Sequence, residues 1–148
     1  MVSRESRPPV SSASIVVLTL ARRVEAELNA ALAPLDLTVS KLGLLGHIAS
    51  VSGASFSDLA RMSGITVQTV HAAVKGLVKA GLVRDLTARA GSASAIEITD
   101  DGARLLQAAQ EVVTGVDERL FGAEADPIQR RLGEAVLTAF REMLDSKA

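Results

Sequence analysis

The stretch SFSDLARMSGITVQTVHAAVKGLVKAGLV, which runs from Ser55 to Val83, carries the clearest structural pattern in this sequence. Its first residues form a capping box, because the hydroxyl of Ser55 can accept from the backbone amide of Asp58 while the Asp58 carboxylate reaches back to the amide of Ser55. A short helix is therefore expected from Asp58 to Met62. Gly64 closes it, since glycine readily takes the left-handed conformation that ends helices.

A second helix follows within the same stretch. Thr66 is suited to cap it, and it is expected to run to Ala80, with Gly81 as its stop. Its inner side is expected to hold Val70, Val74, Leu77 and Val78. Two helices joined by a tight turn of about three residues predict a helix-turn-helix, in which the second helix enters the major groove of DNA and the first braces it.

The hydrophobic period changes after Gly81. Leu82–Thr87 and Ala95–Ile98 are predicted to be two short strands, joined by a Gly, Ser and Ala loop over Ala88–Ser94. Such a hairpin would form a wing beside the helix-turn-helix. Its Arg89 is suited to enter a minor groove, where negative potential concentrates.

Long helices are expected on both sides of this region. The first should begin at Ser11, Ser12 or Ser14 and end before Pro34; the others should begin at Thr38, at Thr99 and at Pro127. The predicted fold is mainly α, with a small β-hairpin wing and long terminal helices. Residues 1–10 are expected to be a flexible arm, and residues 11–148 a single domain.

The long helices also predict a partner. The helix before Pro34 and the helix after Thr99 are each about twenty residues, or roughly 30 Å, long. Helices of that length outside a compact winged-helix lobe need another surface on which to bury their apolar stripes. A homodimer supplies one, and its two-fold symmetry would match a palindromic site with half-sites about one helical turn apart.

Composition excludes several classes of function. The chain of 148 residues has no cysteine, which rules out disulfides, thiolate metal sites and thiol redox sensing. Its only histidines are His47 and His71, far apart in the sequence, so no metal site and no cofactor are predicted. No apolar run approaches the roughly 18 residues of a membrane span, so we expect a cytoplasmic protein without a membrane partner.

Charge is distributed unevenly, although the net charge is only −1. The segment 61–91 holds one acid, Asp85, among five basic residues: Arg61, Lys75, Lys79, Arg84 and Arg89. The segment 96–126 is strongly acidic. A basic middle beside an acidic C-terminal third suggests one face for phosphates and another for a different purpose, although clustering on solvated helices would look the same.

Side chains in the first turns of the second helix are the candidates for reading DNA. Gln68 can pair with the edge of adenine, and His71 can hydrogen-bond to purine N7 or O6. Lys75 and Lys79 lie further along the helix, where phosphates are the more plausible contacts. The full predicted DNA-binding set is Thr66, Val67, Gln68, Thr69, His71, Ala72, Lys75, Lys79, Arg84 and Arg89.

Four short motifs in this order resemble the MarR (multiple antibiotic resistance regulator) family. They are Ser57-Asp58-Leu59-Ala60, Ile65-Thr66-Val67-Gln68-Thr69-Val70, Leu77-Val78-Lys79-Ala80-Gly81-Leu82-Val83 and Ile98-Thr99-Asp100-Asp101-Gly102. The resemblance covers nearly the whole chain. It implies a winged helix-turn-helix regulator that acts as a homodimer on a palindromic double-stranded operator, often a repressor that a small molecule releases.

The resemblance also implies a division of labour. Residues 11–36 and 99–148 would form the dimerisation helices, and residues 37–98 the DNA-binding lobe. By the same resemblance, a small-molecule effector would bind between them. The composition of such a pocket, mainly Leu, Val and Ala, would suit an apolar or weakly acidic molecule, with His47 as a candidate contact, although a structural role for His47 is the more common one. Two departures stand out: many members have a basic residue where Ala72 stands, and an Asp-x-Arg pair in the wing where this chain has Arg89 without the matching Asp.

Two other functions fit the sequence less well. A winged helix can serve as a protein–protein interaction module without binding DNA, and the apolar Val67 and Ala72 and the unusual wing favour that alternative. An enzyme is not expected, because the sequence shows neither a glycine-rich phosphate loop nor a pairing of nucleophile and base.

Overall fold

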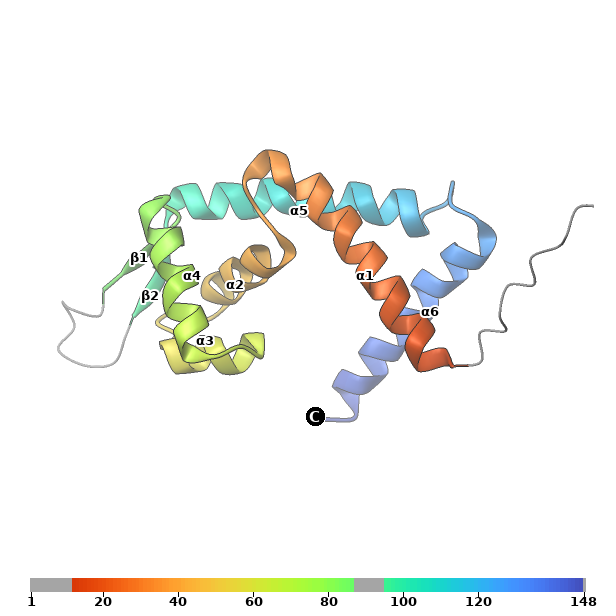
Figure 1. Cartoon of the computed structure of the whole chain (residues 1–148), viewed down its shortest axis with the longest axis horizontal. Coiled ribbons are helices and arrows are strands. Elements are labelled where there is room, and N and C mark those ends of the chain that lie inside the picture. Colours follow the sequence, from red (N-terminus) through yellow and green to blue (C-terminus); the bar gives the residue numbers. More distant parts are fainter. Residues whose placement is uncertain (1–11, 87–94, 148) are drawn as a thin grey trace, which may run out of the picture.

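The computed structural model describes residues 12–86 and 95–147, and it is mainly helical (Figure 1). In chain order the elements are α1 (Ala13–Leu32), the short 3₁₀ helix η1 (Ala33–Leu35), α2 (Val39–Ser50), α3 (Phe56–Ser63), α4 (Val67–Lys79), β1 (Val83–Asp85), β2 (Ile96–Ile98), α5 (Asp100–Phe121) and α6 (Pro127–Asp145). Helix α5 extends along most of the molecule, with α2, α3, α4 and the hairpin at one end and α1 and α6 at the other (Figure 1). The predicted fold class is confirmed.

Local capping explains where the long helices begin. The hydroxyl of Ser12 accepts from the amide of Ile15 at 3.3 Å, and the hydroxyl of Thr38 accepts from the amide of Lys41 at 3.2 Å. Thr99 starts α5, and Asp126 followed by a proline at the first position starts α6. These starts were expected from the sequence, because each depends on one polar side chain and the backbone beside it.

The lobe around the helix-turn-helix has its own apolar core. The buried residues come from α2, α3, α4, both strands and the segment before α3: Leu44, Leu45, Ile48, Ala54, Leu59, Ala60, Val70, Val74, Leu77, Val83 and Ile96. Val78, which was expected on the inner side of α4, is instead 41% exposed. Val78 instead lines a hollow beside β1, together with Asp85, and does not belong to the core of the lobe.

The hairpin is antiparallel, with Val83 opposite Ile98, Arg84 opposite Glu97 and Asp85 opposite Ile96. The amide of Leu86 also donates to the carbonyl of Ala95 at 2.8 Å, so the pairing continues one step beyond the assigned strands. The two strands were expected from the sequence. The tip of the predicted wing, including Arg89, lies outside the described residues.

A close joint connects the lobe to α5. The amide of Thr99 donates to the carbonyl of Leu82 at 3.0 Å, and its hydroxyl donates to the carbonyl of Gly81 at 2.7 Å. Three residues on, a Cβ atom added to Gly102 would stand 2.1 Å from the carbonyl oxygen of Leu82. Only glycine fits here, and the joint fixes the direction in which α5 leaves the lobe.

Apolar side chains along α6 and on the first turns of α1 face outward in the single chain. No residue of α6 is buried, although the helix carries Ile128, Leu132, Val136, Leu137, Phe140, Met143 and Leu144. On α1, Ile15 is 61% exposed and Val17 is 62% exposed. Further along α1 the expected stripe is half-buried at Val24, Leu28 and Ala31, whereas no other described residue buries the stripe of α6.

Within the described ranges, no single helix is long and apolar enough to cross a membrane. One pair, α1 with η1 followed by α2, reaches the length and composition together, but it is bent by 71°.

Candidate DNA-binding interface

The first helix of the motif is held at its start by the predicted capping box. The amide of Asp58 donates to the hydroxyl of Ser55 at 3.0 Å, while the hydroxyl and amide of Ser55 donate to the Asp58 carboxylate at 2.8 and 3.1 Å. These hydrogen bonds, together with the positive charge of Arg61, hold the pKa of the Asp58 carboxyl below its ordinary value. The start of α3, and with it Phe56, is thereby fixed.

The turn into the second helix depends on Gly64 and Thr66. Gly64 has a φ of 65°, a left-handed conformation that glycine adopts without steric cost, and it ends α3. The hydroxyl of Thr66 then accepts from the amide of Thr69 at 3.1 Å and lies 2.8 Å from the Thr69 hydroxyl. Both threonines of the predicted DNA-binding set therefore help to form the cap of α4.

Helix α4 has a buried side and a clear outer side. Val70, Val74 and Leu77 are buried in the lobe. The opposite side carries Gln68, Ala72, Lys75 and Lys79, which are all exposed. Their spacing of three or four residues places them along one line of the helix. This line presents two base-reading candidates followed by two cations.

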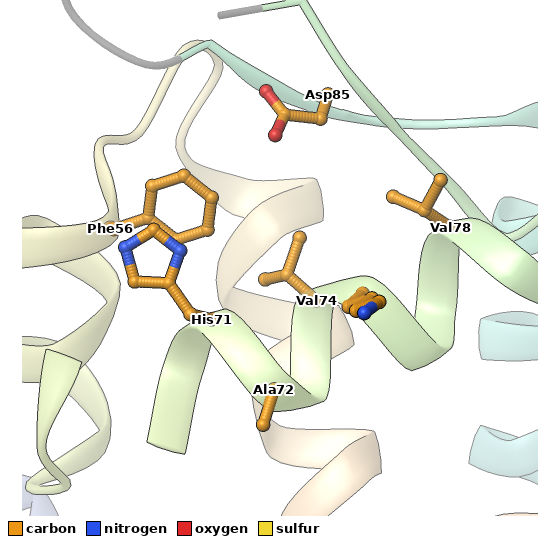
Figure 2. A pocket seen from close by; sticks show the side chains of 7 residues that line it. Phe56, His71, Ala72, Val74, Val78 and Asp85 are labelled. Carbon is orange, nitrogen blue, oxygen red and sulfur yellow. The ribbon is translucent and has the colours of Figure 1, made fainter. Parts of the chain in front are cut away.

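His71 lies on the flank of α4 and not along this outer line. Its ring stacks on the ring of Phe56, with 3.8 Å between the ring centroids and 18° between the planes. The two rings border a hollow of about 370 Å³ between α4, the start of α3 and β1, which is also lined by Ala72, Val74, Lys75, Val78 and Asp85. Figure 2 shows the imidazole turned toward Phe56, and Ala72 directed away from it. Sequence reasoning did not identify Phe56, because no local pattern pairs position 56 with position 71.

The remaining predicted residues of this interface are divided between the helix start and the hairpin. Val67, at the first position of α4, is exposed. Arg84 is exposed on β1, and its register partner across the hairpin is Glu97. An acidic neighbour directly opposite Arg84 reduces the positive potential that this arginine offers to phosphates. The cations along the outer line of α4 are therefore the clearest candidates for phosphate contact in the described part of the chain.

A second hollow lies between the lobe and α5. It has a volume of about 540 Å³ and is lined by Leu42 and Gly46 from α2 and by Leu106, Gln110, Val113 and Thr114 from α5. We call it the α2–α5 cleft. His47 is half-buried beside Gly46 but does not line this cleft. Across residues 12–86 and 95–147, no group of three acidic or histidine side chains is placed to hold a metal ion.

Comparison with known proteins gives a consistent result. A family model described as the MarR family matches residues 35–91, which include the whole helix-turn-helix. The HTH-type transcriptional repressor Rv2887 of Mycobacterium tuberculosis is 31% identical over 105 residues, covering 70% of this chain and 76% of the repressor.

Solved structures of MarR family protein Rv2887 share this fold. Its complex with DNA superposes with a TM-score of 0.71 at 24% identity, over 94% of this chain and 99% of that chain. Its complex with p-aminosalicylic acid gives a TM-score of 0.66 at 26% identity, over 92% and 98% of the two chains.

Proposed function

Because this chain belongs to the MarR family, we propose that it is a homodimeric transcriptional repressor that binds a palindromic double-stranded operator and is released by a small molecule. The outer line of α4 is the observation that carries the proposal. It places the amide of Gln68 and the methyl group of Ala72 before the cations of Lys75 and Lys79, as base readout followed by phosphate contact requires.

The homodimer is supported by the exposed apolar side chains of α1 and α6. We propose that residues 11–36 and 99–148 form the dimerisation helices and that residues 37–98 form the DNA-binding lobe. The outward-facing apolar side chains of α1 and α6 would bury one another across a two-fold axis, since an apolar surface of this extent is rare on a monomer. Each lobe would then present its α4 to one half of a palindrome.

Two single substitutions separate the proposed roles on α4. Gln68→Ala should narrow the gap in affinity between the preferred operator and a one-base variant, because a bidentate contact distinguishes adenine from other bases. Lys75→Ala should weaken binding to all sequences about equally and lower the log–log salt slope by nearly one unit for each phosphate that is no longer neutralised. Fluorescence anisotropy at several salt concentrations measures both effects. Identical effects from the two substitutions would contradict this assignment of roles.

We further propose the α2–α5 cleft as the effector site. It lies where the lobe meets α5, so a bound molecule would contact both parts and favour one relative orientation of them. Its lining is mainly aliphatic, with polar atoms from Gln110 and Thr114. The hydroxyl of Thr114 donates to the carbonyl of Gln110 at 2.9 Å, so its oxygen can still accept a hydrogen bond. An apolar or weakly acidic molecule with one or two polar groups suits such a lining.

Two glycines of α2 provide a matched test of the cleft. A side chain at Gly46 would enter the cleft, whereas Gly43 lies outside its lining, and an added Cβ meets nothing within 4 Å at either position. With p-aminosalicylic acid as the probe, Gly46→Leu should raise the concentration that releases DNA by at least about 10-fold while DNA binding itself persists. Gly43→Leu should leave release unchanged. Equal release from both variants would place the effector elsewhere.

We propose no catalytic role for the chain, and we propose that it acts in the cytoplasm. The relative named above, Rv2887, is a transcriptional repressor. Nothing in that comparison supports the alternative of a winged helix used only for protein contact.

A further inference from the structure

We infer that Phe56 determines the base preference of α4 by holding His71 away from the base edges, so that Gln68 and Ala72 read adjacent A·T pairs. This inference rests on the proposed function as a DNA-binding protein. It assigns a positioning role to a residue of α3 that would not itself contact DNA.

The position of Phe56 is set by local structure and by the core. It is the first residue of α3, directly after Ser55, whose hydroxyl and amide are both engaged with Asp58. Its ring is partly buried and packs against the core of the lobe. The imidazole of His71 lies flat on this ring, with centroids 3.8 Å apart. A stacked pair with one fixed member restricts the rotamers of the other.

Helix geometry adds a second reason. Gln68 and Ala72 are four residues apart and lie on the side opposite the buried valines, while His71 is rotated toward β1. In Figure 2 the imidazole is near Phe56 and on the side of Asp85, with Ala72 pointing away from both. To reach a base edge in line with Gln68, the His71 side chain would have to leave the stack.

The chemistry of the remaining outer residues favours A·T pairs. A glutamine amide pairs in bidentate fashion with N6 and N7 of adenine, and an alanine methyl group contacts the methyl group of thymine. A histidine at the groove would add hydrogen bonds to N7 or O6 of guanine, and the stack removes that contribution. The charged groups that line the same hollow as His71 are Lys75 on α4 and Asp85 on β1, and neither lies between His71 and Phe56.

Selection from randomised double-stranded DNA with the full-length protein tests the inference. The unaltered protein should select A·T pairs at two adjacent positions in each half-site. The affinity of each variant is then measured for the selected duplex and for a duplex in which one of these pairs is changed to G·C. The first affinity divided by the second is its discrimination ratio. Phe56→Leu should lower the ratio at least about fivefold, because the freed His71 can donate a hydrogen bond to N7 or O6 of guanine. Phe56→Tyr, which keeps the ring, should retain it.

His71→Ala tests the same inference without altering Phe56. Alone it should change the discrimination ratio by less than about twofold, and combined with Phe56→Leu it should restore most of the discrimination. A large drop in the ratio from His71→Ala alone, or a uniform drop in affinity from Phe56→Leu with unchanged base ranking, would overturn the inference. Failure of the unaltered protein to select any sequence would instead contradict the proposed function.

Discussion

Replacing Val136 and Phe140 of α6 with glutamate is expected to separate the dimer and to abolish operator binding. The two residues are one helical turn apart, and they are 58% and 57% exposed in the single chain. In the proposed dimer they would be buried against the partner, where an unpaired carboxylate costs several kcal/mol. The dissociation constant of the dimer should rise at least about 100-fold. Because each lobe alone contacts one half-site, affinity for the palindrome should fall to the non-specific level.

Thr138 supplies the matched control. It lies between the two altered positions in sequence but on the opposite side of α6, and it is exposed. Thr138→Glu adds a similar charge and should leave both the dimer and the DNA affinity unchanged. Sedimentation velocity gives the oligomeric state, and circular dichroism confirms that the helices persist. A fully dimeric Val136→Glu, Phe140→Glu variant would contradict the proposed role of α6.

Gly102→Ala is expected to lower the free energy of unfolding by about 2–3 kcal/mol. The reason is steric: the new Cβ would stand 2.1 Å from the carbonyl oxygen of Leu82 and 2.8 Å from Cγ1 of Ile98. The first is a backbone atom, so the contact is relieved only by moving the joint between the lobe and α5. Thr99 holds the same joint through its hydrogen bonds to Gly81 and Leu82, and these should weaken with it.

Gly115→Ala in the same helix should instead raise the free energy of unfolding. A Cβ at this position meets nothing within 4 Å, and alanine is favoured over glycine in a helix interior by up to about 1 kcal/mol. Urea unfolding of both variants at one protein concentration makes the comparison, since the stability of a dimer depends on concentration. If Gly102→Ala were as stable as Gly115→Ala, the close approach of α5 to Leu82 would not exist in solution.

Features that depend on neighbouring residues were predictable from the sequence. The capping box at Ser55 and the caps at Thr38, Thr66 and Thr99 each need only one side chain and the next turn of backbone, and all four are present. The helix-turn-helix follows from these caps and from the glycine at position 64. The caps and the apolar spacing of α4 predict the same helix. The helix-turn-helix could therefore be predicted from the sequence alone.

Features that depend on distant residues were not predictable in the same way. The stack of His71 on Phe56 joins two helices, and the α2–α5 cleft brings residue 46 beside residue 110. Hydrophobic periodicity identified the stripe on α6, but it carries no information on whether the covering surface belongs to the same chain. The exposure of these side chains among the described residues supports the proposed dimer.

Binding of the unaltered protein to an inverted repeat and to one isolated half-site tests the central proposal most directly. A palindrome selected from random DNA, or taken from beside the protein's own gene, should bind two chains per duplex. Its affinity should exceed that of the half-site at least about 100-fold, and that of unrelated DNA at least about 1,000-fold, at moderate salt. One chain per duplex with equal affinity for both sites, or no preference over unrelated DNA, would contradict the account of a symmetric DNA-binding repressor.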